Sequence, residues 1–290
     1  MNHWIQRLVA RFAPALAAVA LAAAPAVSQA AGGGYPLDHF PKEKLTDQAA
    51  LQNGAKLFVN YCLGCHSAGL MRYNRLQDIG LTDAQIRDNL MFTGQKVGDP
   101  MRIAMAPGDA KGWFGALPPD LSVTARARSS HDGTGSDWLY TYLRSYYRDA
   151  TRATGWNNAV FPNVGMPHVF YELQGSRGAT IEEIKKGEGH GFVKTVVTFD
   201  PSGARSEKTE KIEGGHPHEG TSIRLGPASG GKMSQAQYDE QVADLTAFLT
   251  YVADPSAKTR MRLGTWVLLF LGMFTVLAWW LNREYWKDVK

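Results

Sequence analysis

The chain has 290 residues, a formal net charge of +4 and an isoelectric point near 9.0. The basic excess is small and lies partly beside an apolar segment near the C-terminus, and no basic stripe is interleaved with aromatic residues, so we exclude nucleic acid as a partner. About 230 residues separate the apolar segments at the two ends, enough for one domain with long excursions or for two small ones.

Residues 1–30 have the pattern of a secretory signal peptide. Arg7 and Arg11 precede an alanine-rich apolar run, and Ser28 and Ala30 suit the −3 and −1 positions of a cleavage site. An uncleaved membrane anchor is the alternative, but the run is short and rich in alanine for a membrane span. The pattern predicts that the body of the protein is exported.

A helix is predicted from residue 47 to residue 62, because apolar residues recur there at helical spacing. Glycine destabilises the interior of a helix, so Gly54 favours a close crossing with a second helix at this point. The apolar positions are Leu51, Ala55, Phe58, Val59 and Cys62.

The predicted helix ends in Cys62-Leu63-Gly64-Cys65-His66, which contains both cysteines of the chain. A C-x-x-C pair is typical of a redox dithiol, of half a zinc site or, when histidine follows, of covalent haem attachment. Zinc needs four ligands, and the remaining histidines are scattered, with His216 and His218 as the only other pair. A redox dithiol prefers a strand before the motif, which is missing here. Haem attachment therefore fits best, with His66 as an iron ligand.

Gly54 and Phe58 ahead of this motif, and Leu245 and Phe248 near the end of the chain, resemble the pattern of class I cytochromes c. That resemblance implies a sixth iron ligand from a loop well after the attachment motif, often beside proline. Two methionines suit this role: Met105 in IAMAPGD and Met166 in FPNVGMPHVFYE. Gly165 and Pro167 flank Met166 in an irregular loop, which favours Met166, although core filling is the usual role of methionine. Further along, residues 175–232 are rich in glycine and charge, and they contain a predicted β-hairpin around residues 201–203.

A second amphipathic helix is predicted just before the C-terminal apolar segment. Ser234 is its expected N-cap with Gln237 as the capping-box partner, and Pro255 follows its end. Residues 263–281 then form an uncharged run of 19 residues, long enough to cross a bilayer as a helix of roughly 28 Å. We expect a basic linker at 256–262, a transmembrane helix at 263–281 and a cytoplasmic tail at 282–290.

The order of these motifs resembles the cytochrome c1 family, the haem subunit of ubiquinol–cytochrome c reductase. The resemblance rests on the C-x-x-C-H motif, GALPPDLSVTARAR at 115–128, FPNVGMPHV at 161–169, MSQAQYDEQVADLTAFLTYVADP at 233–255 and the final span. It implies a mostly α fold: a class I cytochrome c-like domain at 31–255 with long loop insertions, plus one C-terminal transmembrane helix. The insert at 175–232 departs from the family pattern.

The resemblance also implies the site. One haem c would be bound covalently through Cys62 and Cys65, with His66 and Met166 as iron ligands. A proline carbonyl would accept the imidazole N–H, and Arg128, or Arg126 as the alternative, would pair with a haem propionate. The remaining implied haem contacts are Pro118, Pro119, Trp138, Phe161, Val164 and Pro167.

The implied function is electron transfer from a Rieske iron–sulfur protein to cytochrome c, beside a cytochrome b subunit in a dimeric complex. The chain would lie in the bacterial inner membrane as a single-pass protein, in contact with lipid and with its haem domain in the periplasm. The main alternative is a free-standing anchored electron carrier. Three further alternatives are a haem sensor, a peroxidase and a non-haem structural protein.

Overall fold

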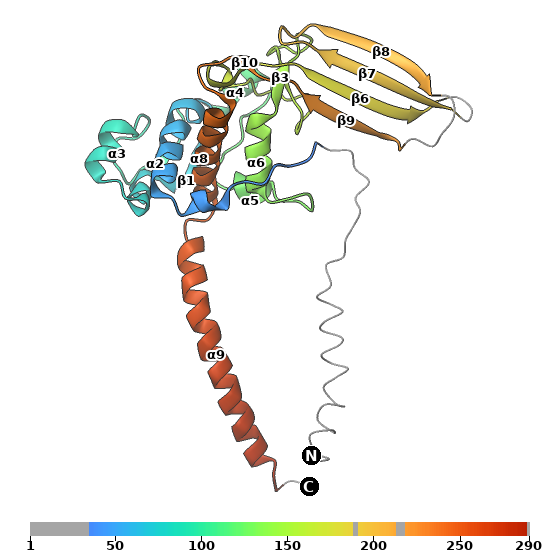
Figure 1. The fold of residues 1–290 in the computed structure, drawn as a ribbon. Helices are drawn as coiled ribbons and strands as arrows, with labels where there is room; N and C mark the ends of the chain where they lie inside the picture. Colours follow the sequence, from blue (N-terminus) through green and yellow to red (C-terminus); the bar gives the residue numbers. More distant parts are fainter. Residues whose placement is uncertain (1–34, 188–190, 213–217, 289–290) are drawn as a thin grey trace. The chain divides into compact units, whose positions relative to one another are not determined.

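The fold is taken from a computed structural model that describes residues 35–187, 191–212 and 218–288. The predicted signal peptide at 1–30 lies outside the described residues. Helical segments dominate the part before the insert and the C-terminal part (Figure 1). They are η1 (Lys42–Leu45), α2 (Gln48–Leu57), η2 (Phe58–Cys62), η3 (Tyr73–Ile79), α3 (Asp83–Asn89), α4 (Pro107–Phe114), α5 (Thr124–Ala127), α6 (Gly135–Arg144), α7 (Tyr171–Gln174), α8 (Gln235–Ala253) and α9 (Ala257–Tyr285).

The strands form small antiparallel pairs and one larger sheet. β1 (Ala68–Arg72) pairs with β2 (Pro100–Met101), and β3 (Tyr146–Arg148) pairs with β4 (Trp156–Asn158). β5 (Gly175–Ser176) pairs with β10 (Ser229–Gly230). The larger sheet has the order β8-β7-β6-β9 and comprises β6 (Ala179–Lys186), β7 (Phe192–Phe199), β8 (Arg205–Ile212) and β9 (Gly220–Leu225).

Helices α2 and α8 cross in close contact, as Gly54 predicts. A Cβ built on Gly54 would lie 2.1 Å from the carbonyl oxygen of Asp244 and 2.6 Å from Cβ of Phe248. The rings of Phe58 and Phe248 pack at a centroid distance of 5.7 Å, and Leu245 is fully buried beside them. This crossing forms the centre of the main hydrophobic core and fixes the end of α2 that leads into the cysteine motif.

The ends of these helices follow the expected capping rules. Asp47 accepts hydrogen bonds from the backbone N–H groups of Ala49 and Ala50 at the start of α2. Ser234 and Gln237 form the predicted capping box of α8. The last turn before Cys62 differs from the prediction, because Leu63 N donates to Phe58 O over five residues, so η2 is a π-helical turn rather than regular α-helix.

The predicted hairpin in the insert is confirmed as β7 and β8, with a tight turn at residues 200–204 where Gly203 has a φ of 96°. The insert is larger than this hairpin, since β6 and β9 complete a four-stranded sheet (Figure 1). Its base contacts the helical domain through a small cluster of Tyr147, Ala179 and Phe199.

Helix α9 is long and apolar enough to cross a membrane, and its candidate span, Thr259–Tyr285, is not buried against other parts of the described chain. The helix begins at Ala257, so most of the expected linker at 256–262 has helical conformation. It also continues past residue 281 to Tyr285. Arginine, lysine and methionine are good helix formers, so nothing in these flanking sequences stops the helix.

Candidate haem site

The two thiols of the motif lie on one tight turn. Cys62 is the last residue of η2, and the backbone N–H groups of Cys65 and His66 both donate to its carbonyl oxygen, at 3.0 and 2.8 Å. Cys62 is buried and Cys65 is exposed, and neither forms a disulfide. Burial raises the pKa of the Cys62 thiol to about 12. The turn therefore presents two reduced thiols at the edge of the core.

The imidazole of His66 is held in one orientation by a backbone carbonyl. Its Nδ1 lies 2.7 Å from the carbonyl oxygen of Pro119, and the side chain is only 8% exposed. Because a carbonyl can only accept, Nδ1 must carry the hydrogen, which leaves the Nε2 lone pair for a metal. Burial lowers the pKa of His66, against the opposing effect of the hydrogen bond to Pro119, and this favours the neutral ring.

The loop that carries Pro119 is itself well anchored. Asp120 accepts hydrogen bonds from the backbone N–H groups of Gly69 and Ser122, both at 2.8 Å, and Leu121 N donates to Ser67 O at 2.8 Å. Burial raises the pKa of Asp120, but the hydrogen bonds outweigh it, so the pKa lies below its ordinary value and the side chain stays ionised. These contacts tie the P-P-D-L-S segment to the chain just after His66.

An aromatic wall lies at the start of α6. Trp138 stacks on Tyr142 at a centroid distance of 4.7 Å and meets the ring of Phe161 edge-on at 6.5 Å. The guanidinium of Arg128 lies 4.4 Å from the centre of the Trp138 ring and 5.5 Å from that of Phe161. The structure therefore brings together three residues that the resemblance implies as haem contacts.

The two candidate arginines have different surroundings. Arg126, the alternative to Arg128, points to Asp254 after α8 at 3.8 Å and is largely exposed. Arg128 lies against the aromatic wall and forms no ion pair within the described residues. Arg128 is thus the arginine whose charge remains available beside Trp138.

The loop that carries Met166 is fastened to α6 and to β3. The hydroxyl of Tyr142 lies 3.5 Å from Sδ of Met166, and that of Tyr146 lies 3.4 Å from the Met166 carbonyl oxygen. Val164 is buried in the main core, Met166 is half-buried against it, and Pro167 is exposed. Met105 lies between β2 and α4 and makes none of these hydrogen bonds within the described residues.

The sequence reasoning missed the tyrosine pair. Tyr142 follows Trp138 by four residues on one face of α6, and Tyr146, four residues further on, is the first residue of β3. Burial raises the pKa of both hydroxyls, which keeps them protonated and able to donate. This spacing is the signal that could have identified them.

The donor set fits a covalently attached haem. Such a group needs two thiols, a nitrogen ligand with a fixed tautomer, apolar surface and a cation for its carboxylates. All of these are present, and the side chains of Val123 and Phe161 are apolar and exposed, at 47% and 43%. No alternative cluster of three or more metal-binding side chains occurs among the described residues.

A model of the cytochrome c1 family matches residues 39–176 and 230–289. The chain belongs to the cytochrome c1 family. The matched residues include the C-x-x-C-H motif, the P-P-D-L-S segment and the Met166 loop, as well as all of α8 and α9. Residues 177–229, which contain the four-stranded sheet, fall outside the match, so the insert is an addition to the cytochrome c1 pattern.

The proteins to which this chain is similar include two cytochromes c1. A cytochrome c1 of Allochromatium vinosum is 43% identical over 267 residues, covering 92% of this chain and 95% of the relative. A protein of Nitrosomonas europaea named ammonia monooxygenase gamma subunit is 40% identical, covering 93% of this chain and 96% of its own length. The cytochrome c1 of Rhodospirillum rubrum is 26% identical over 84% of this chain and 83% of its own.

Membership of the cytochrome c1 family implies covalently bound haem c, and the two cysteines that this requires are present. It agrees with a c-type cytochrome domain followed by one apolar C-terminal helix. The mostly α fold expected from the sequence is confirmed, with the four-stranded sheet as the main departure from a purely helical chain.

Proposed function

We propose that the chain is the membrane-anchored monohaem cytochrome of ubiquinol–cytochrome c reductase. It would accept an electron from a Rieske iron–sulfur protein and pass it to cytochrome c. The observation that carries the proposal is the fixed imidazole: His66 directly follows the two thiols, and its Nδ1–H donates to Pro119 O at 2.7 Å. Nε2 is thereby available for iron.

The residues that would hold the haem are Cys62 and Cys65 as thioethers, His66 Nε2 and Met166 Sδ as the axial ligands. When bound, the haem supplies an iron centre that exchanges one electron, and histidine–methionine ligation raises its potential. If His66 and Met166 both bind the iron, it would have no position left for a substrate. This favours electron transfer over oxygen activation or peroxidase chemistry.

The surrounding residues would set the properties of that centre. Pro119 orients the imidazole, and the Tyr142 hydroxyl donates to the thioether that would bind iron. Arg128 offers a guanidinium to a haem propionate, whose burial without a cation is unfavourable. Trp138 and Phe161 would exclude water from the haem. Pro118 in the P-P-D-L-S segment, and Val164 and Pro167 in the Met166 loop, would do the same.

The same proposal includes the partners and the location. Helix α9 would anchor the chain in a bacterial inner membrane, with the haem domain in the periplasm and the C-terminal end in the cytoplasm. The anchor would hold the haem beside a cytochrome b subunit and the Rieske protein of a dimeric complex, which replaces diffusion by a high effective concentration. The predicted signal peptide at 1–30 supports export of the domain.

Two measurements test the proposal. Haem staining after denaturing electrophoresis should reveal one covalent haem per chain, and the stain should disappear in the Cys62→Ala/Cys65→Ala double variant. Affinity purification from membranes in mild detergent should recover a b-type cytochrome and a Rieske protein with the chain. Recovery of the haem protein without either partner would instead identify a free-standing carrier.

The sixth ligand has its own test. Met166→Leu should keep the haem attached but lower its potential, because thioether ligation stabilises ferrous iron. A shift of about 100 mV would correspond to roughly 2.3 kcal/mol for one electron. Met105→Leu is the matched control and should leave the potential and the ferric sulfur-to-iron absorption band unchanged. Loss of that band only in Met105→Leu would assign the ligand to Met105.

A further inference from the structure

Arg177 is a buried cation with part of its guanidinium unpaired. Its side chain is 8% exposed, and its Nε donates to the carbonyl oxygen of Tyr146 at 3.0 Å. One Nη atom, however, is buried without a hydrogen-bond partner among the described residues. Leaving a buried charged donor unsatisfied is unfavourable, and burial lowers the pKa of Arg177 accordingly. Such a group requires an explanation.

The neighbouring arginines do have counter-ions, so the unpaired charge belongs to Arg177. Arg144 bonds to Asp239 at 2.6 Å and to Asp38 at 2.7 Å. Arg224 pairs with Glu182 on the adjoining strand. Within the part of the chain that the structure describes, no carboxylate lies within ion-pair distance of Arg177. The local excess of positive charge is therefore built into the fold.

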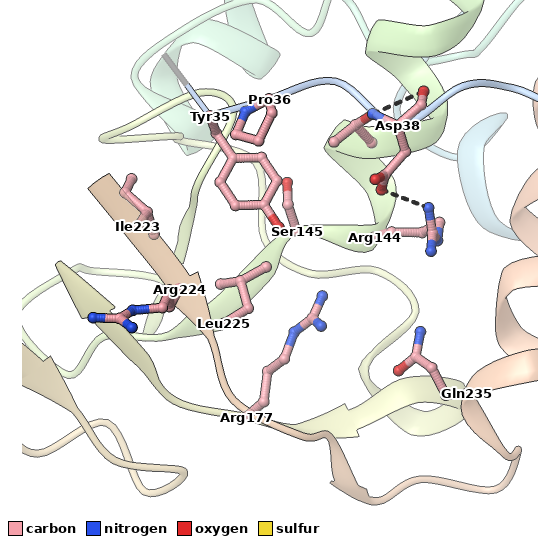
Figure 2. Close-up of a pocket in the computed structure, with 11 residues that line it drawn as sticks. Tyr35, Pro36, Asp38, Arg144, Ser145, Arg177, Ile223, Arg224, Leu225 and Gln235 are labelled. Atoms are coloured by element: carbon pink, nitrogen blue, oxygen red, sulfur yellow. Dashed lines mark hydrogen bonds and ion pairs between the residues drawn. The ribbon is translucent and has the colours of Figure 1, made fainter. Parts of the chain in front are cut away.

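Arg177 lines a pocket of about 430 Å³. Figure 2 shows its side chain extending into the space between Tyr35, Ser145 and Arg144. The pocket also has an apolar side, to which Pro36 and Leu225 contribute. Its volume falls within the range of pockets that bind small molecules in proteins.

Two parts of the chain build this pocket together. Arg144 and Ser145 belong to the end of α6 in the family-matched domain, whereas Arg177 and Leu225 belong to the segment that the family pattern lacks. Backbone hydrogen bonds fix the junction, with Arg148 N donating to Arg177 O at 2.9 Å and Gly226 N donating to Gly178 O at 2.9 Å. The insert thus supplies the unpaired cation, and the haem domain supplies the opposite wall.

We propose that this pocket binds a small-molecule oxyanion, a carboxylate or a phosphate, through the guanidinium of Arg177. The planar fork of arginine matches both groups, and a charge-assisted bond would satisfy the buried donor. Tyr35 places its hydroxyl at the same space, and Leu225 and Pro36 would contact the carbon part of the ligand. The site is separate from the haem-binding residues and does not depend on their assignment.

The test uses the full chain with its haem, solubilised in detergent. Isothermal titration calorimetry and thermal unfolding are measured with sodium phosphate and, separately, with sodium succinate, each against sodium chloride at equal ionic strength. We expect saturable binding and a raised unfolding temperature with at least one oxyanion and neither effect with chloride. The two arms distinguish a phosphate ligand from a carboxylate ligand.

Variants then localise the binding. Arg177→Gln should weaken it by about tenfold or more, because it removes the charge-assisted bond. Tyr35→Phe, which removes the hydroxyl that faces the pocket, should weaken it by a smaller factor and is the second variant if Arg177→Gln does not fold, as judged by its haem absorption. Lys208→Gln is the matched control, since Lys208 pairs with Glu210 on β8 and does not line the pocket. Equal binding by wild type and by each of the Arg177→Gln and Tyr35→Phe variants that folds, or no saturable binding by either oxyanion, would overturn the proposal.

Discussion

The hydroxyl of Tyr142 lies 3.5 Å from the sulfur of Met166 and 2.6 Å from the hydroxyl of Tyr146. Tyr146 in turn lies 3.4 Å from the carbonyl oxygen of Met166. The two hydroxyl groups have only two protons to donate, so they cannot form all three hydrogen bonds at once. If Tyr142 donates to the thioether, Tyr146 can donate to Tyr142 or to the carbonyl, and the shorter distance favours Tyr142.

Tyr142→Phe should lower the haem potential without detaching the haem. A donor to the thioether withdraws electron density from sulfur, which disfavours ferric iron, so its removal favours the ferric state. A neutral hydrogen bond is worth up to about 1 kcal/mol, or about 40 mV for one electron. Redox titration measures the shift. Tyr140→Phe, on the same helix without a described hydrogen bond to Met166, should keep the wild-type potential, and an equal shift in both variants would contradict this role.

Arg128→Gln should also lower the potential, whereas Arg126→Gln should leave it unchanged. Arg128 carries an available charge beside Trp138, and removing a cation near the haem stabilises the more positive ferric state. We expect the potential of Arg128→Gln to fall by about 40 mV, which corresponds to roughly 1 kcal/mol for one electron. Arg126 is largely exposed and shares the carboxylate of Asp254 with Arg260. Redox titration of the two variants in parallel decides which arginine faces the propionates, and the reverse pattern would assign the role to Arg126.

Gly54→Ala should destabilise the domain by about 1–3 kcal/mol or more, because the new methyl group would overlap the backbone of α8. Chemical denaturation followed by haem absorbance measures the change. Gly112→Ala is the control, since Gly112 lies within α4 with open space around the new Cβ. That variant should gain roughly 0.5–1 kcal/mol from helix propensity. A neutral Gly54→Ala would show that the helices can separate without loss.

Asp137 should make the domain sensitive to acid. Burial raises its pKa, but hydrogen bonds from Thr134 and from the backbone N–H of Phe40 outweigh this and lower the pKa below its ordinary value of 3.8. A depressed carboxyl pKa stabilises the fold above the unfolded value, and this contribution is lost as the pH falls through the folded pKa. We therefore expect the free energy of unfolding to decline below about pH 4.

Asp137→Asn isolates that contribution. The variant should be less stable than wild type by about 1–2 kcal/mol at pH 7, because the amide nitrogen cannot accept from Thr134. The difference should shrink as the pH falls, since only the wild type titrates. Denaturation curves at several pH values measure it, with Asp109→Asn as an exposed control. A difference that is independent of pH would show that the carboxylate charge is not responsible.

Much of the fold was predictable from local signals. Several of these signals are single residues or contiguous segments whose physical role is visible in the sequence. They are the capping residues Asp47 and Ser234, the glycine at the helix crossing and the long apolar run. The cysteine motif is equally explicit, because attachment chemistry constrains consecutive residues. The hairpin at β7 and β8 was predictable for the same reason, since its turn residues are contiguous.

The remaining features depend on contacts between distant segments. The π-helical turn before Cys62 has no sequence signal that separates it from α-helix, because the same apolar spacing serves both. The partner of Arg126 lies 128 positions away at Asp254, and the role of Arg177 depends on a pocket wall from α6. The contact between the Tyr142 hydroxyl and the sulfur of Met166 likewise joins residues 24 positions apart, which the sequence alone does not bring together.

The two-residue ladder between β5 and β10 has a consequence for how this chain can change over evolutionary time. It pairs Gly175 with Gly230 and Ser176 with Ser229, so the chain leaves the haem domain and re-enters it at neighbouring points. The unmatched stretch 177–229 begins directly after β5 and includes the first residue of β10. The ends of the insert are held side by side, so its length affects stability only through the entropy of loop closure. That free-energy cost rises by only about 0.6 kcal/mol for each doubling of the loop length. Segments of very different size can thus be exchanged at this point while the electron-carrying domain stays the same, so a new binding property could be acquired here without redesign of the haem pocket.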